Sequence, residues 1–183
     1  MSRIFTPASI DEAPAASRPL LEAVKKLLGS APNLFRMVAN SPAALEGYVG
    51  LLGALAKGSL PAATHERIAL LVAEANGCDY CLSAHSWLGK NVAKLDDAEM
   101  NANRRAASSD QKAAAALRFA RAVMETRGHV SDEQLRAARE AGYDDAQIVE
   151  IVQHVALNTW TNYVNSVART QVDFPVVAAR KVA

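Results

Sequence analysis

The chain has 183 residues, of which 50% are apolar and 21% are charged, and its formal net charge is +1. This length and composition suit a single folded domain, residues 1–183, and exclude a disordered or fibrous chain. Lys and Arg are spread along the chain and are balanced by Asp and Glu, so we expect no basic patch for nucleic acid or for an anionic membrane. A small, roughly neutral partner is the better prediction.

No segment resembles an export signal or a membrane span. The first residues, Met1 to Pro7, contain no apolar run of signal-peptide length. The densest apolar run, 68–73, is far shorter than the about 20 residues that cross a bilayer. We therefore expect a cytoplasmic protein that does not enter the membrane.

Helix start and stop signals recur along the chain, whereas strand signals are nearly absent. Ser41 followed by Pro42 predicts a helix start, Ser131 with Gln134 predicts a capping box, and Gly77 predicts a helix end. These signals indicate an all-α fold, a compact helical bundle of about seven to nine helices. The predicted helices cover 17–28, 33–40, 42–57, 62–76, 78–91, 96–106, 110–127, 131–141 and 144–170.

The two cysteines of the chain, Cys78 and Cys81, lie three residues apart, and His85 follows four residues later. On a helix that begins near Cys78, all three side chains share one face. Thiols in the first helical turn meet unpaired backbone N–H groups and the positive end of the helix dipole, which favour the thiolate. In a cytoplasmic protein this spacing favours thiol redox chemistry over a structural disulfide framework.

Two other interpretations of the cysteines remain open. They could be two small buried apolar residues, or they could form a zinc site with His85. Zinc normally takes four ligands, and the other histidines, His65, His129 and His154, show no paired spacing. We therefore favour the redox pair, expect no metal and no cofactor, and expect these three histidines to be ordinary surface or capping residues.

Several polar residues near the cysteines are further candidates. Glu66 lies on an otherwise apolar helix, where a carboxylate must be paired, so it belongs either to a functional site or to an ion pair with Arg67 or another basic group. Glu74, four residues before the first cysteine, is the rival carboxylate, although we expect it to face a gap or a subunit contact. Tyr80 could hydrogen-bond at the site or simply pack.

Three asparagines of the last predicted helix, Asn158, Asn162 and Asn165, lie at helical spacing on one face. They could line the site, or they could bind helix ends and a neighbouring subunit. We favour the structural interpretation.

The segment from Glu66 to His85, ERIALLVAEANGCDYCLSAH, resembles the core of the alkylhydroperoxidase D-like proteins of the carboxymuconolactone decarboxylase superfamily. The later segments GYDDAQIVEIVQ and NTWTNYVN are similar to the peroxidase-related branch of that superfamily. The resemblance implies an all-helical fold, a homo-oligomer (a trimer or a hexamer) and the reduction of hydroperoxides by a cysteine pair. The pattern of predicted helices leaves the chain ends, 1–16 and 171–183, as tails or as arms that clasp a neighbouring subunit.

Carried over residue by residue, the resemblance also implies the roles of the site residues. Cys81 attacks the peroxide, Cys78 resolves the product as a disulfide, and His85 works with Glu66 as a proton relay. The best-studied members have a histidine just before the second cysteine, where this chain has Tyr80, so a second imidazole is missing at that position.

We therefore predict a peroxidase-type oxidoreductase that reduces alkyl hydroperoxides and is itself reduced by a dithiol or a thioredoxin-like protein. One alternative is a carboxymuconolactone decarboxylase-like lyase, but such members generally lack the cysteine pair. The other is a non-catalytic redox sensor, in which the pair changes state and alters oligomerisation.

Overall fold

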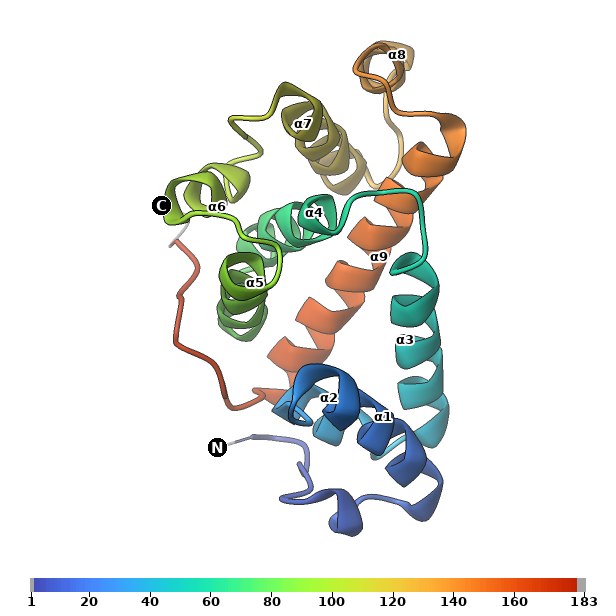
Figure 1. Cartoon of the computed structure of the whole chain (residues 1–183), viewed down its shortest axis with the longest axis vertical. Coiled ribbons are helices and arrows are strands. Elements are labelled where there is room, and N and C mark those ends of the chain that lie inside the picture. The colour runs from blue at the N-terminus through green and yellow to red at the C-terminus, as the bar shows by residue number, and fades with distance from the viewer. Residues whose placement is uncertain (1, 181–183) are drawn as a thin grey trace.

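The computed structural model describes residues 2–180, and among them it contains nine α-helices, two short 3-10 helices and no strand (Figure 1). The predicted all-α fold is therefore confirmed. The α-helices are α1 Arg18–Leu28, α2 Asn33–Val38, α3 Pro42–Leu55, α4 Ala62–Ala75, α5 Asp79–Asn91, α6 Asp97–Asn103, α7 Gln111–Thr126, α8 Asp132–Glu140 and α9 Asp145–Ala168. The 3-10 helices are Ile10–Glu12 and Ala15–Ser17.

The local start and stop signals explain where the helices begin and end. The hydroxyl of Ser41 accepts a hydrogen bond from the backbone N–H of Ala44 at the start of α3. Ser131 and Gln134 form the predicted capping box of α8, and α9 begins with a second capping box. Gly77, with φ of 65°, takes up the left-handed conformation that ends α4 and turns the chain into α5.

Helix α4 lies at the centre of the bundle and packs against α5, α6, α7 and α9 (Figure 1). Its segment 68–73 is buried on all sides, as its nearly continuous apolar sequence requires. Leu70 faces a core cluster shared with α1, α2, α3 and α5, whereas Val72 faces a second cluster shared with α7, α8 and α9. Burying each such side chain contributes about 1.5–3 kcal/mol, so α4 is the element that joins the two halves of the core.

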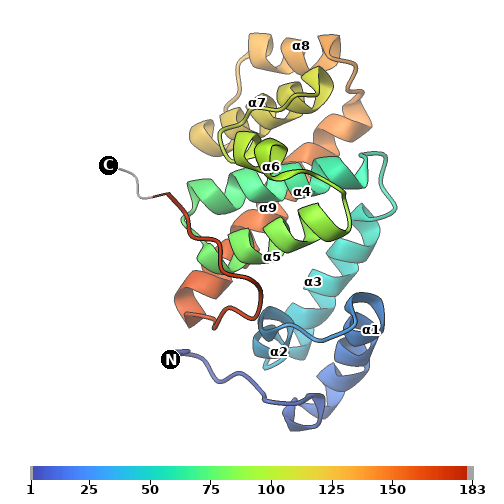
Figure 2. The same ribbon diagram turned by 60° about the vertical axis from the view of Figure 1, so that its left-hand side comes forward.

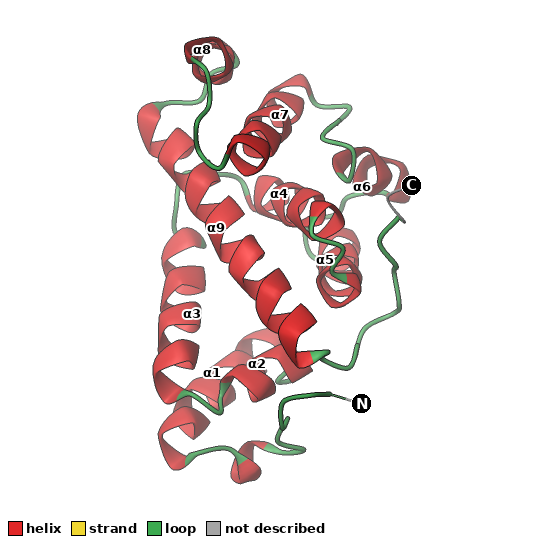
Figure 3. Ribbon diagram, turned by 180° about the vertical axis from the view of Figure 1, so that it is seen from behind, coloured by secondary structure: helices red, strands yellow, loops and turns green. Residues whose placement is uncertain are grey.

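Helix α9 is the longest helix and crosses the whole molecule, as the view from behind shows (Figure 3). It contacts α3, α4, α5 and α7, and its buried face carries Ile151, Val155 and Leu157. The opposite face remains apolar but exposed. No helix of the described residues is both long enough and apolar enough to cross a membrane.

The C-terminal segment 171–180 runs across α5 and returns to α6 (Figure 2). The hydroxyl of Ser83 accepts the N–H of Val177 at 2.9 Å, and a carboxylate oxygen of Asp79 accepts the N–H of Ala179 at 2.8 Å. We call this segment the C-terminal strap. Within the chain its backbone is held by side chains of α5. That this segment also clasps a neighbouring subunit stays a prediction; residues 181–183 lie outside the described residues.

The N-terminal segment also packs on its own chain. The backbone N–H of Arg3 donates to the carbonyl of Ala168 at the end of α9, and Ala13 is buried against the first core cluster. Residues 2–16 therefore pack on their own chain, and their role as an arm that clasps a neighbouring subunit stays a prediction. The two ends of the chain cover the same end of the bundle, where α2, α5 and α9 meet.

Candidate active site

The two thiols lie where α5 begins. Cys78 is the N-cap residue of α5, and its sulfur accepts the backbone N–H of Cys81 at 3.3 Å. Cys81 itself stands in the first turn, as the sequence predicted. Both side chains are buried, with exposed fractions of 4% and 2%, so the backbone N–H groups at this helix end act on them without competition from water.

The two sulfurs differ in acidity although they are neighbours. Their Sγ atoms lie 2.7 Å apart, and the thiol of Cys78 donates to the sulfur of Cys81. This hydrogen bond, together with the charge of His85, lowers the pKa of Cys81 to about 7 against the opposing effect of burial. The same bond and burial raise the pKa of Cys78. Cys81 is therefore the better nucleophile, and Cys78 is the thiol that keeps its proton.

Glu66 and His85 are brought together by the contact between α4 and α5. The Nδ1 of His85 lies 2.8 Å from a carboxylate oxygen of Glu66. Burial lowers the pKa of His85, but the carboxylate and the Cys81 thiolate raise it more, so the pKa is raised overall. The alternative pairing of Glu66 with its sequence neighbour is wrong, because Arg67 binds Glu99 at 2.9 Å.

Asn165 contacts the nucleophilic thiol, although the sequence analysis favoured a structural role for it. Its side-chain Nδ2 donates to the sulfur of Cys81 at 3.3 Å, so α9 contributes a donor to the thiolate. Asn162, one turn earlier, accepts a hydrogen bond from Asn76 at 3.0 Å and also lowers the pKa of Cys81. The structural interpretation of the asparagine face is therefore wrong for Asn165. The sequence did contain a signal for this contact, namely the helical spacing that places the three asparagines on one face of α9.

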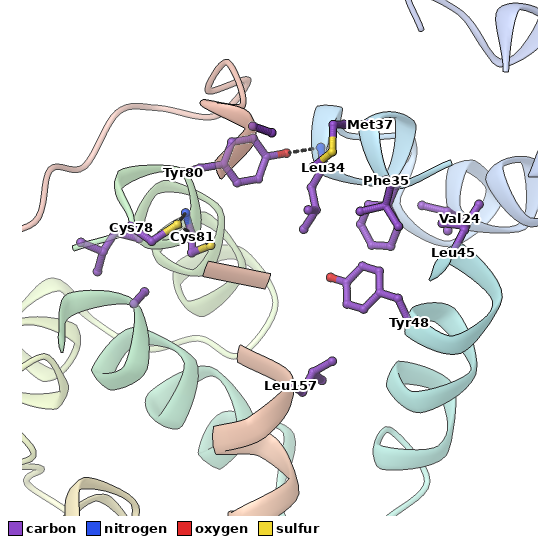
Figure 4. Close-up of a cluster of buried hydrophobic side chains, with 14 of the residues drawn as sticks. Val24, Leu34, Phe35, Met37, Leu45, Tyr48, Cys78, Tyr80, Cys81 and Leu157 are labelled. Carbon is purple, nitrogen blue, oxygen red and sulfur yellow. Dashed lines mark hydrogen bonds between the residues drawn. The ribbon is translucent and has the colours of Figure 1, made fainter. Parts of the chain in front are cut away.

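Tyr80 and Glu74 do not belong to the relay. The hydroxyl of Tyr80 accepts the backbone N–H of Leu34 at the start of α2, at 3.0 Å (Figure 4). Its ring meets Phe174 of the C-terminal strap edge-on, with centroids 6.0 Å apart. Glu74 binds Arg104 at 2.7 Å and faces α6. Both residues hold neighbouring segments in place around the cysteine motif.

Two histidines lie together beside this site, contrary to the expectation that they are surface or capping residues. The rings of His65 on α4 and His154 on α9 stack with centroids 4.2 Å apart. Burial, reinforced by the neighbouring imidazole, lowers the pKa of His154 to about 4, and burial also lowers that of His65. The imidazole of His154 is therefore neutral at pH 7. Among residues 2–180 no group of three or more His, Cys, Asp or Glu side chains is placed to hold a metal ion.

Comparison with protein families agrees with the resemblance drawn from the cysteine segment. Residues 42–126, which run from the start of α3 to the end of α7, match the model of the carboxymuconolactone decarboxylase family. No curated protein matches the chain.

Solved structures share the fold over nearly the whole chain. An alkylhydroperoxidase AhpD core, an uncharacterized peroxidase-related protein from Ralstonia eutropha JMP134, has a TM-score of 0.83 at 24% identity and covers 94% of this chain and 92% of its own. An uncharacterized peroxidase-related protein from Silicibacter sp. TM1040 has a TM-score of 0.81 at 22% identity, over 93% and 91% of the two chains. The debrominase Bmp8, as a cysteine-to-alanine variant with 2,3,4-tribromopyrrole, has a TM-score of 0.78 at 22% identity over 94% of each chain. At these identities the likeness establishes the fold.

Proposed function

We propose that this chain, which carries the carboxymuconolactone decarboxylase family domain over residues 42–126, is a thiol-dependent peroxidase that reduces alkyl hydroperoxides. The observation that carries the proposal is the convergence of four groups. An acidic thiol, Cys81, stands beside a protonated thiol, Cys78, and next to the ion pair of His85 and Glu66. The lyase alternative assigns no role to such a thiol pair.

The geometry supports a two-step cycle. His85 accepts the proton of Cys81, and the resulting thiolate attacks the terminal oxygen of the hydroperoxide. The S–O bond forms, the O–O bond breaks, and the alkoxide takes the proton from His85 to leave as an alcohol. Cys78 then attacks the sulfenic acid of Cys81, and a disulfide forms as water leaves with the thiol proton. The neighbouring thiol thus captures the sulfenic acid before it is oxidised further.

The cycle needs a partner that supplies two electrons and two protons to the disulfide. A dithiol or a thioredoxin-like protein has the right chemistry, because thiol–disulfide exchange restores both cysteines. Such reductants keep thiols reduced in the cytoplasm, which is the location that we propose. Neither a nucleic acid nor a membrane takes part in this proposal.

We further propose that the protein is a homo-oligomer that uses the exposed face of α9. Five large apolar side chains of α9 are more than a third exposed and repeat at helical spacing on one side, and we call them the α9 stripe: Val149, Val152, Trp160, Tyr163 and Val167. A contiguous apolar face of this kind is typical of a subunit contact. A second copy of the chain, as a trimer or a hexamer, is the occupant that we propose.

Peroxide consumption with dithiothreitol as reductant tests the proposed activity. We expect the wild type to consume cumene hydroperoxide catalytically and Cys81→Ser to be inactive. In the absence of dithiothreitol, Cys78→Ser should complete one turnover and stop at a sulfenic acid, which dimedone traps on Cys81. Equal consumption by wild type and Cys81→Ser would contradict a thiol peroxidase and would favour the lyase. A disulfide that forms without turnover would favour the redox sensor.

Reductive dehalogenation is the second candidate, and the fold likeness to a debrominase favours it. The electron balance is the same: the thiolate accepts a halogen as a positive fragment, the second thiol displaces halide, and the carbanion left behind takes a proton. The aromatic side chains of the first core cluster, Phe35 and Tyr48, give the site an apolar side that suits such a substrate. Release of bromide from 2,3,4-tribromopyrrole, measured beside peroxide consumption, distinguishes the two activities.

A further inference from the structure

Two buried amides of α9 each keep one polar atom without a hydrogen-bond partner. Within residues 2–180, neither the Nδ2 of Asn162 nor the Oδ1 of Asn165 is paired, although the two residues are only 0% and 3% exposed. A buried polar atom left unpaired costs about 1–3 kcal/mol, and nearly all such atoms in folded proteins are paired. Two of them on one helix face therefore mark a place where a small polar group binds.

The other atom of each amide fixes where this place lies. The Nδ2 of Asn165 donates to the Sγ of Cys81 at 3.3 Å, so its Oδ1, which is bonded to the same carbon, lies beside that sulfur. The Oδ1 of Asn162 accepts the Nδ2 of Asn76, two residues before Cys78, at 3.0 Å. Asn162 and Asn165 are three residues apart, which makes their side chains neighbours on α9. Both unpaired atoms thus border the nucleophilic thiol.

The two unpaired atoms differ in kind, since an amide nitrogen donates and an amide oxygen accepts. A hydroperoxide carries a donor, the O–H of its terminal oxygen, next to an acceptor, its inner oxygen. It can therefore pair with both amides at once. The N–H of a bromopyrrole can pair with the Oδ1 of Asn165 but leaves the Nδ2 of Asn162 unpaired. The two amides together thus fit an O–O–H group better than a halogenated pyrrole.

We propose that Asn162 and Asn165 bind the hydroperoxide group at Cys81: the Oδ1 of Asn165 accepts the terminal O–H, and the Nδ2 of Asn162 donates to the inner oxygen. This inference rests on the proposed peroxidase function and deepens it, because it names residues that hold the substrate. They lie on α9, whereas the cysteine pair and the relay belong to α4 and α5.

The exposed fractions indicate how the substrate lies. The side chains of His85 and Glu66 are 23% and 19% exposed, whereas the two thiols and the two amides are at most 4% exposed. The relay is therefore the side on which the site meets solvent. The substrate enters past the relay, with its O–O–H end directed inward to the amides.

The two amides act on different oxygens during the reaction. When the Cys81 thiolate attacks the terminal oxygen, the S–O bond forms, the O–O bond breaks and its electron pair stays on the inner oxygen. The Asn162 amide stabilises this negative charge until the inner oxygen takes the proton from His85 and leaves in the alcohol. The terminal oxygen keeps its hydrogen, so the sulfenic acid of Cys81 stays bonded to Asn165. This bond holds the sulfenic acid in place for attack by Cys78.

Two single variants, Asn162→Ala and Asn165→Ala, test the two roles independently. Reduced protein is mixed with cumene hydroperoxide for one turnover, without dithiothreitol, at a pH well above the pKa of Cys81, so that the thiol is ionised in every variant. Oxidation should be about 100-fold slower in Asn162→Ala, the loss typical of one missing oxyanion donor. It should be about fivefold to tenfold slower in Asn165→Ala, the loss expected for one neutral hydrogen bond.

Alkylation of Cys81 by iodoacetamide under the same conditions separates peroxide binding from a structural effect. Iodoacetamide has no O–O–H group and needs only an ionised, accessible thiol, so both variants should be alkylated at the wild-type rate. Asn158→Ala is the matched control, because Asn158 lies on the same face of α9 but donates to the backbone carbonyl of His154 at 2.8 Å. It should change neither rate.

The outcomes distinguish this inference from the proposed function. Oxidation at the wild-type rate in either variant overturns the role of that residue. Oxidation and alkylation that fall by the same factor overturn the binding site, because the amides then only hold the thiols in place. Both outcomes leave the peroxidase intact, whereas a wild type that consumes no hydroperoxide overturns both proposals.

Discussion

The Nδ2 of Asn165 lies 3.3 Å from the Sγ of Cys81, so α9 donates a hydrogen bond to the thiol at the start of α5. This bond favours the thiolate over the thiol, since a thiolate is the stronger acceptor. The acidity of Cys81 therefore depends on a helix more than eighty residues away in the sequence.

Replacing Asn165 should weaken the nucleophile without removing it. We expect Asn165→Ala to raise the pKa of Cys81 and to slow its alkylation at pH 7 by roughly threefold to tenfold. Asn158→Ala is the matched control, because the amide of Asn158 donates to the backbone carbonyl of His154. Stopped-flow alkylation across a pH series measures both, and an unchanged profile in Asn165→Ala would remove this residue from the site.

The reactivity of wild-type Cys81 should titrate near neutrality. The hydrogen bond from Cys78 lowers the pKa of Cys81 to about 7, whereas the pKa of Cys78 is raised. Labelling of Cys81 should therefore rise with pH to a plateau with a midpoint near 7, while Cys78 stays unlabelled. Mass spectrometry after brief alkylation checks the order, and preferential labelling of Cys78 would reverse the assignment.

The lowered pKa of Cys81 also determines in which direction the free energy of unfolding changes with pH. Because the pKa of Cys81 is lower in the folded state than in the unfolded state, its thiolate stabilises the fold above the unfolded pKa, and this contribution is lost as the pH falls through about 7. Between pH 7 and the ordinary cysteine pKa, the free energy of unfolding should therefore increase with pH in the wild type. The increase should be smaller in Cys81→Ser. Urea unfolding at several pH values measures the difference.

Local signals predicted the helices well, because caps and stops act within one or two turns. The shared face of Cys78, Cys81 and His85 could also be predicted from the local sequence, since the three residues occupy two turns of one helix. The contacts of His154 and Asn165 could not be predicted from the local sequence, because they depend on how α9 packs against α4 and α5. The C-terminal strap was missed for a related reason: its backbone is held by side chains of a distant helix and has no periodic pattern of its own.

Tyr80 stands where the resemblance implies a histidine, and its contacts predict a structural effect. Tyr80→Phe removes the hydrogen bond to the N–H of Leu34 while keeping the contact with Phe174. We expect the free energy of unfolding to fall by about 1 kcal/mol and the peroxidase rate to stay unchanged. Chemical denaturation beside the activity assay tests both. A large loss of rate in a stable variant would place the phenol in the mechanism after all.

The α9 stripe should determine the oligomeric state. A charge at the centre of an apolar contact is costly, so Val152→Glu is expected to dissociate the oligomer into 19.5 kDa chains. Leu27→Glu is the matched control, because Leu27 is an exposed leucine on α1, outside the stripe. Light scattering at micromolar concentration reports the mass of each. A wild type that is already monomeric, or an unaffected Val152→Glu oligomer, would contradict the proposed interface.

The pairing of His85 with Glu66 makes a kinetic prediction, because two members of one relay act as a unit. General acid–base groups typically contribute about 10²–10⁴-fold, so His85→Ala and Glu66→Gln should each lower kcat/KM for a hydroperoxide far more than they lower the melting temperature. Losses of members of one catalytic unit are strongly non-additive. The double variant should therefore lower kcat/KM only slightly more than the more severe of the two single variants does.

Glu74→Gln is the control for the carboxylate, since Glu74 is as buried as Glu66 but binds Arg104 outside the relay. We expect it to lower the melting temperature and to leave kcat/KM nearly unchanged. Measuring kcat/KM for the two single variants, the double variant and the control separates a relay from an ion pair that only holds α4 against α5. If the two single losses multiply in the double variant, His85 and Glu66 act independently, and the 2.8 Å contact between them is structural.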